Sequence, residues 1–151
     1  MLVSTQGTSC CPCQQVREYV YLFGAVSPED GDGFFITTPK CDTNCTGIFL
    51  SELSNRYPDE LILVIADNAP WHKSKALNIP ENIRFAFLPP RTPEMNPIEQ
   101  IWTEIRKEGQ FKNVLIPTLN KVEEKLIEAV KNLSKETVKS ITGRDWILSL
   151  F

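Results

Sequence analysis

This 151-residue chain has no long apolar run, no surplus of basic residues and only one histidine. No apolar stretch approaches the roughly 20 residues of a membrane-spanning helix. The polar residues after Met1 to Val3 do not form the apolar core of a secretion signal. A cytoplasmic protein without a membrane partner is therefore expected. The net charge of −3 and the pI of about 5.2 exclude a strongly basic DNA-binding module, so affinity for DNA has to come from a local patch, a metal or another domain.

The remaining composition is that of an ordinary globular chain, with 42% hydrophobic and 23% charged residues. Residues 1–15 show no periodicity and are predicted to form an irregular tail, and residues 16–151 are predicted to form one folded domain. The odd number of cysteines argues against a disulfide framework. Their spacing is also not the usual C-x2-C pairing of zinc sites, so free thiols are favoured over zinc. These cysteines are Cys10, Cys11, Cys13, Cys41 and Cys45.

A wholly apolar run from Leu61 to Ala66 ends abruptly in Asp67. Such a run predicts a central strand that is buried on both faces. Pro70 follows closely and predicts a short helix over residues 70–77. Asp67 is thus placed at the carboxyl end of a strand, where open α/β sheets bind their ligands. On this evidence alone, Asp67 either orders the turn or belongs to a functional site.

A second carboxylate, Glu99, is placed near the start of a predicted helix. Asn96 suits the N-cap and Pro97 the first helical position. Taken alone, Glu99 is better explained as a capping-box residue, whose side chain accepts the backbone N–H of the N-cap residue. Spacing of i, i+3, i+4 and i+7 gives the helix one buried face that excludes Glu99. That face comprises Ile98, Ile101, Trp102 and Ile105.

The remaining elements are predicted from local patterns. Asp30 and Asp32 belong to two Asp-Gly steps, which favour a hairpin turn over metal ligation. The predicted strands cover residues 18–26, 34–38 and 83–88, and the predicted helices cover 42–57, 97–108, 118–133 and 136–141.

Taken together, the residues around the two carboxylates form a dense pattern. Asp-Asn-Ala-x-x-His ends the strand, and Leu-Pro-Pro-x-x-Pro-x-x-Asn-Pro-Ile-Glu-x-x-Trp leads into the helix. This pattern resembles the catalytic core of mariner-like DDE transposases, in particular their bacterial insertion-sequence branch. The resemblance runs from about Val16 to near the C-terminus. The matching residues are Asp67, Asn68, Ala69, His72, Leu88, Pro89, Pro90, Pro93, Asn96, Pro97, Glu99 and Trp102.

The resemblance implies an α/β, RNase H-like fold: a mixed sheet, with a hairpin and parallel strands, flanked by helices. It also implies three acidic residues that bind two divalent metals, of which Asp67 is the second and Glu99 the third. Hard oxygen ligands favour Mg2+ or Mn2+, and two such ions suit phosphodiester chemistry. The implied partners are transposon-end and target DNA, together with a second copy or a full-length transposase. Supporting or DNA-contacting roles are expected for Asn68, His72, Asn96, Arg91 and Lys73, with a structural role for His72 equally open.

One feature departs from the resembled family. No Asp or Glu precedes Glu18, so the first catalytic aspartate is absent. Its strand is therefore predicted to be missing too, with Met1 to Thr5 as the stretch that could pair in its place. We expect an N-terminally truncated transposase core that is inactive alone. One alternative is a non-catalytic remnant that binds or regulates full-length transposase. Another is a different RNase H-like nuclease whose missing acid comes from Asp30, Asp32, Asp42 or Asp59.

Overall fold

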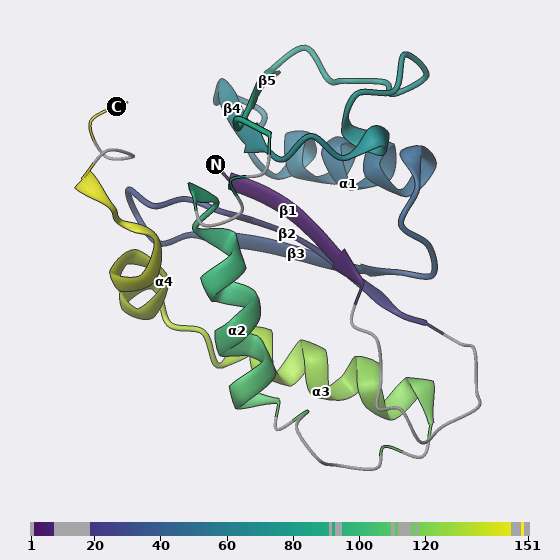
Figure 1. The fold of residues 1–151 in the computed structure, drawn as a ribbon, viewed down its shortest axis with the longest axis vertical. Helices are drawn as coiled ribbons and strands as arrows, with labels where there is room; N and C mark the ends of the chain where they lie inside the picture. Colours follow the sequence, from purple (N-terminus) through teal and green to yellow (C-terminus); the bar gives the residue numbers. More distant parts are fainter. Residues whose placement is uncertain are drawn as a thin grey trace.

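A single five-stranded sheet forms the centre of the molecule (Figure 1). The computed structural model describes residues 2–7, 19–90, 92, 95–109, 111, 116, 118–145 and 149. The strand order is β3-β2-β1-β4-β5, with β1 antiparallel to β2 and parallel to β4. This is a mixed sheet that joins an antiparallel hairpin to a parallel pair, as predicted. The strands are β1 (Leu2–Gly7), β2 (Tyr21–Val26), β3 (Gly33–Thr38), β4 (Ile62–Ala66) and β5 (Ile83–Phe87).

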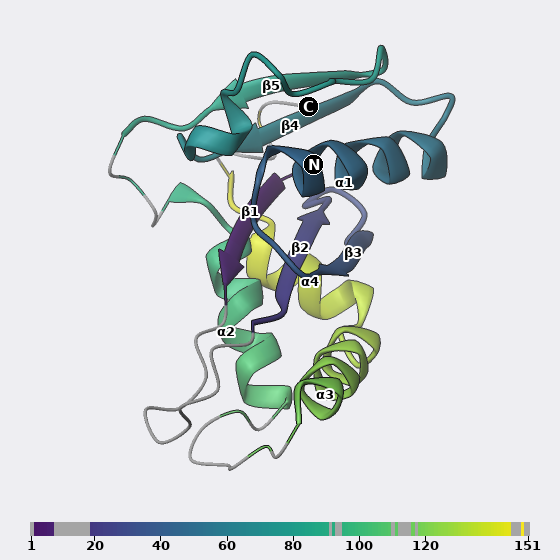
Figure 2. The ribbon, with the colours of Figure 1, turned by 90° about the vertical axis from the view of Figure 1, so that its right-hand side faces the viewer.

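Helices cover both faces of the sheet. In Figures 1 and 2, α1 lies on one side of strands β1 to β3, and α2, α3 and α4 lie on the other. No helix among the described residues has the length and apolarity needed to cross a membrane. The helices are α1 (Thr43–Arg56), the 3-10 turn η1 (Pro70–His72), α2 (Ile98–Glu108), α3 (Leu119–Lys131) and α4 (Lys135–Thr142).

Successive side chains of β2 alternate between two hydrophobic cores, one on each face of the sheet. Leu22 and Val26 pack in the cluster that contains the buried residues of α2, α3 and α4. Phe23 and Ala25 pack in the cluster that contains the buried residues of α1. Successive side chains of a strand point to opposite faces, so one short strand supplies both cores. The two cores fix the positions of α1 and α2 relative to the same strand.

Strand β4 also feeds both cores, but not along its whole length. Ile65 joins the cluster on the α2 side, and its neighbours Val64 and Ala66 join the cluster under α1. Leu61 and Leu63 are 74% and 38% exposed. The prediction that the whole run is buried on both faces is therefore wrong at its start, because the α2-side cluster reaches Ile65 and not Leu63. The carboxyl end of the strand, which leads into the site, is the buried part.

The prediction that the first strand is missing is wrong. Leu2–Gly7 forms β1 and lies between β2 and β4. Its register pairs Leu2 with Ile65 and Val3 with Ala66, so it supplies backbone partners that β2 and β4 would otherwise lack. This stretch is thus a strand and not part of an irregular tail. Residues 8–18, with three of the five cysteines, lie outside the described residues, and the predicted boundary near residue 15 stays a prediction.

Most helix ends differ from the predicted bounds by one or two residues, and the helix after Pro70 differs by more than a turn. The helix expected over residues 70–77 is only the single turn η1, because Ser74 begins a separate turn in which its hydroxyl oxygen accepts the Ala76 N–H. Helix α2 begins at Ile98 and not at Pro97. The predicted hairpin is confirmed. Asp42 caps α1, because its side chain accepts a hydrogen bond from the Cys45 N–H.

The β2–β3 hairpin turn anchors the ends of two helices. Asp30 Oδ1 accepts the N–H of Asp32, as expected of a turn residue. Asp32 accepts a 2.5 Å hydrogen bond from the Tyr57 hydroxyl at the end of α1. It also lies 3.5 Å from Lys135 Nζ at the start of α4. The interpretation of Asp30 and Asp32 as turn residues is confirmed.

Replacement of Gly31 in this turn by alanine is expected to destabilise the protein. Gly31 has a φ of 75°, and a Cβ there would meet the Lys135 carbonyl oxygen at 2.2 Å. We expect Gly31→Ala to lower the free energy of unfolding by about 1–3 kcal/mol in urea melts. Gly47→Ala in α1 is the matched control, because an added Cβ has room at that position. Alanine is favoured over glycine inside a helix, so this variant should gain about 0.5–1 kcal/mol of unfolding free energy. Equal stability of the two variants would contradict the prediction.

Candidate functional site

Asp67 follows the last residue of β4 and is held by its own turn. Its Oδ1 accepts the N–H of Ala69 at 3.1 Å and lies 2.9 Å from Nδ1 of His72. Burial acts to raise the pKa of Asp67, but the hydrogen bonds from His72 and Ala69 and the attraction of His72 outweigh it. The pKa is therefore lowered, and the carboxylate is ionised at neutral pH. The side chain is 45% exposed, so it is open to a ligand.

The neighbouring Asn68 locks the ends of the two parallel strands together. Its Nδ2 donates to the carbonyl oxygen of Leu88 at 2.6 Å, and the Leu88 N–H donates to the carbonyl oxygen of Ala66 at 2.9 Å. Asn68 therefore fixes the direction in which the chain leaves β4. The hydrogen bond that the Asn68 side chain makes is therefore a structural one, to the backbone of Leu88.

Glu99 lies in the first turn of α2, half-buried, and Asn96 shapes the start of that helix. Asn96 is 2% exposed, and its Oδ1 accepts the N–H of Ile98 at 3.4 Å. The Glu99 N–H donates to the Asn96 carbonyl oxygen at 3.1 Å. The apolar face predicted for the helix is confirmed, so α2 is fixed in rotation and Glu99 stays off the core. The buried residues of α2 are Ile98, Ile101, Trp102 and Ile105.

The two predicted acids line one pocket. Asp67 and Glu99 border a cavity of about 130 Å³ at the carboxyl ends of β4 and β5. Asn68 and Asn96, both singled out from sequence, border it too. The other lining residues are Leu88, Pro89 and Thr92.

The other predicted residues fall around this acidic pocket. His72 lies behind Asp67, 3% exposed. Lys73 is exposed, with its Nζ 4.9 Å from the centre of the Phe87 ring. Arg91 lies outside the described residues. Thr92 lines the pocket and was not predicted, because a lone threonine in a Pro-rich turn carries no pattern; its hydroxyl donates to the Pro89 carbonyl oxygen.

A third acid does not join this pocket in the described part of the chain, where no group of three or more His, Cys, Asp or Glu side chains is placed to hold a metal. Asp30 and Asp32 belong to the hairpin turn, and Asp42 caps α1. Cys45 is a free thiol. Asp30, Asp32 and Asp42 are therefore engaged elsewhere, and Asp59 is an exposed turn residue ahead of β4.

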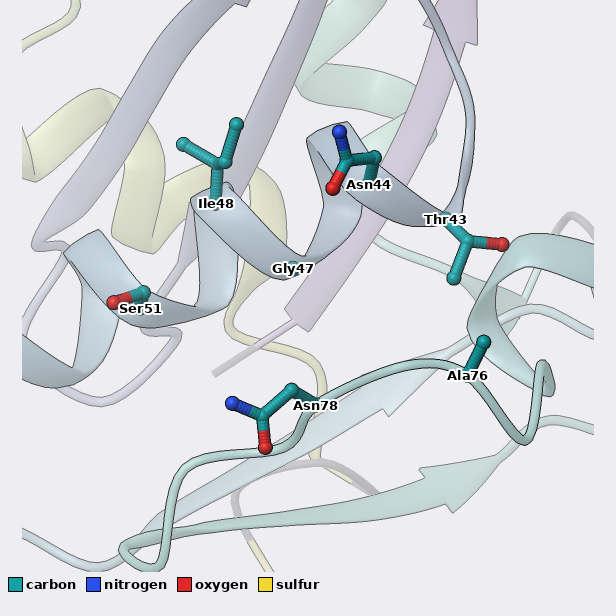
Figure 3. Close-up of a pocket in the computed structure, with 7 residues that line it drawn as sticks. All are labelled: Thr43, Asn44, Gly47, Ile48, Ser51, Ala76 and Asn78. Carbon is teal, nitrogen blue, oxygen red and sulfur yellow. The ribbon is translucent and has the colours of Figure 1, made fainter.

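A second pocket, of about 410 Å³, lies between α1 and the segment that follows η1 (Figure 3). Asn44 and Ser51 of α1 line it on one side, and Asn78 of the facing segment lines it on the other. None of the described residues that line it has an ionisable side chain, so these residues offer no group for acid–base or metal chemistry. The smaller acidic pocket is the candidate site. The remaining lining residues of the larger pocket are Thr43, Gly47, Ile48 and Ala76.

Known structures show the same fold. The chain superposes on Mos1 transposase, solved as a paired-end complex with the left transposon end, with a TM-score of 0.65 and 12% identity over 94% of this chain and 50% of that one. The catalytic core domain of BIV integrase gives a TM-score of 0.58 at 16% identity, and the match covers 99% of this chain and 98% of that one. At these identities the likeness establishes an RNase H-like fold, as predicted.

Sequence comparison identifies the family. The uncharacterized protein y4pE/y4sA of Sinorhizobium fredii (strain NBRC 101917 / NGR234) is 40% identical over 89 residues, which cover 58% of this chain and 66% of that protein. This chain thus spans less than two thirds of that relative and about half of the Mos1 chain. A sequence model of the DDE superfamily endonucleases matches residues 3–123, which include both acids of the pocket. The chain therefore belongs to the DDE superfamily endonuclease family.

Proposed function

We propose that this chain is the catalytic core of a mariner-like DNA transposase of the bacterial insertion-sequence type. Asp67 and Glu99 would bind a divalent cation for DNA strand cleavage and strand transfer. The observation that carries the proposal is that these two acids, from different elements, line the same pocket. Strand β4 and helix α2 deliver them to the carboxyl edge of the sheet, where ligands of α/β proteins are bound.

The pocket fits one hard cation. Mg2+ in proteins is usually held by one or two carboxylates together with water and substrate phosphates. The lowered pKa of Asp67 keeps one such carboxylate ionised, and Glu99 supplies a second. When bound, the ion would stabilise charge on the phosphate oxygens of DNA. Mg2+ or Mn2+ is the cofactor that these oxygen ligands favour.

A two-metal site needs more negative charge than the described residues supply. Strand β1 occupies the position next to β4, but its sequence, LVSTQG, contains no carboxylate. We infer that a second cation is bound weakly and that the chain cleaves DNA poorly by itself.

DNA is the proposed substrate, with a second copy of the chain or a full-length transposase as protein partner. Lys73 is exposed beside Phe87, close to the strand end that carries Asp67, and is suited to contact a backbone phosphate. The net charge of −3 gives little non-specific attraction to DNA. Binding is therefore expected to depend on the cation, and the small number of phosphate contacts should give it only a shallow dependence on salt.

Calorimetric titration with Mn2+ tests the metal site. We expect the unaltered chain to bind Mn2+, and Asp67→Asn or Glu99→Gln to weaken binding by about tenfold or more, equivalent to about 1.4 kcal/mol. Asp59→Asn is the matched control, because Asp59 is an exposed turn residue at the amino end of β4. Absence of Mn2+ binding, or equal loss in all three variants, would refute the proposed site.

A second candidate, a non-catalytic chain that binds and regulates full-length transposase, is favoured by the lack of a carboxylate in β1. Addition of this chain to an active insertion-sequence transposase should then lower its cleavage rate, with the two proteins eluting together. Unchanged cleavage and separate elution would exclude this role.

A further inference from the structure

We propose that His72 is a positioning residue. Its Nδ1–H holds one oxygen of Asp67, Oδ1, and so presents the other oxygen, Oδ2, to a cation. The part of this inference that concerns a cation rests on the proposed function. The contact itself, and the tautomer that it requires, can be tested without any metal.

The geometry around Asp67 concentrates its hydrogen bonds on one oxygen. His72 Nδ1 lies 2.9 Å from Oδ1, and the Ala69 N–H donates to the same atom at 3.1 Å. An ionised carboxylate is acceptor-only, so the imidazole has to be the donor. Two donors on Oδ1 set the plane of the carboxylate and favour Oδ2 as the metal-binding oxygen.

The burial of His72 indicates that the contact with Asp67 is the reason for a histidine at this position. The side chain is fully buried, and its other nitrogen, Nε2, has no hydrogen-bond partner among the described residues. A buried polar atom without a hydrogen-bond partner destabilises the folded state. An apolar side chain would fill the same space without that cost. The ring is therefore best explained by its bond to Asp67, which an apolar residue could not make.

Apolar neighbours hold the ring in place. The Phe85 ring lies 6.4 Å from the imidazole in a tilted arrangement, and the Trp71 ring lies 6.0 Å away, edge to face. The turn η1 supplies the backbone frame, since the His72 N–H donates to the Ala69 carbonyl oxygen at 3.0 Å. Packing fixes the position of the ring, and the ring in turn fixes Asp67. Partners of this kind, one step behind a metal ligand, typically change metal affinity by about 10–100-fold when removed.

The first test reads the tautomer directly. His72 is the sole histidine, so a 15N-labelled sample gives one assignable imidazole. We expect Nδ1 to carry a proton above neutral pH, and this preference to be lost in Asp67→Ala. A proton found only on Nε2 in the unaltered chain would overturn the proposal, whether or not the protein binds metal.

The second test separates positioning from packing. His72→Asn places an amide N–H where Nδ1 was, whereas His72→Leu fills the space with no donor. We expect His72→Leu to weaken Mn2+ binding by about tenfold or more, and His72→Asn to keep most of the affinity. Urea melts of both variants report any loss of folding. Equal Mn2+ affinity in His72→Leu and the unaltered chain would overturn the proposal, and failure of the unaltered chain to bind Mn2+ would instead refute the proposed metal site.

Discussion

The variant Ser4→Asp is expected to bind Mn2+ at least about tenfold more tightly than the unaltered chain, a gain of about 1.4 kcal/mol. It is also expected to nick supercoiled DNA with Mg2+, which the unaltered chain should do poorly. The reason is the register of β1 against β4. Val3 pairs with Ala66, so the next step along both parallel strands brings position 4 beside Asp67. A carboxylate introduced there would join Asp67 and Glu99, and three acids suffice to hold two cations between them.

The matched control is Thr5→Asp, which adds the same charge one residue further along β1. Neighbouring positions of a strand lie on opposite faces of the sheet, so an aspartate at position 5 should not reach the same pocket. Calorimetry and a plasmid-nicking gel measure both variants. A similar gain in Mn2+ affinity from Ser4→Asp and Thr5→Asp would mean that net charge, and not placement beside Asp67, is responsible. No gain from either would contradict the assigned position of β1 relative to the acidic pocket.

The convergence of the two acids was predictable because each belongs to an element with a clear local signal. The β-branched run before Asp67 ends at a proline-containing turn, and the apolar spacing after Pro97 leaves Glu99 off the buried face. The family resemblance then indicated that the two ends meet. The structure places both in one pocket, which local pattern alone could not establish.

The central strand was not predictable in the same way. Leu2–Gly7 is short and half polar, and its pairing with β2 and β4 depends on residues that are far away in sequence. The absence of an acid before Glu18 suggested that the strand itself was absent. Strand formation requires backbone partners and not a catalytic residue, so a strand without an aspartate fills the gap in the sheet.

The contact between His72 and Asp67 also lies beyond sequence reasoning. A helix over residues 70–77 was predicted, and in such a helix the ring would follow helical geometry. Because Ser74 begins a separate turn with Ala76, the structure has only the single turn η1 there. That turn brings the imidazole back within 2.9 Å of the carboxylate. The contact depends on the rotamer of His72 in that turn, which local sequence patterns do not specify.

The largest loss of stability is expected for Trp102→Ala, at about 3–5 kcal/mol of unfolding free energy. Trp102 is 5% exposed and anchors α2 against the sheet. Its ring meets Phe35 edge to face at 6.1 Å and covers Gly24, where an added Cβ would lie 2.7 Å from the indole. Loss of this anchor should also loosen the helix that carries Glu99. We therefore expect Mn2+ affinity to fall together with stability.

Trp102→Phe tests whether the volume of the Trp102 side chain or its indole N–H matters more for stability. The indole Nε1–H is buried and has no hydrogen-bond partner among the described residues, so its removal should not cost a hydrogen bond. Phenylalanine keeps an aromatic surface against Phe35 and should cost less than about 1.5 kcal/mol. Urea melts of both variants give the comparison. If Trp102→Phe proves as destabilising as Trp102→Ala, the indole N–H makes an essential bond, and the account of Trp102 as a packing anchor for the Glu99 helix is wrong.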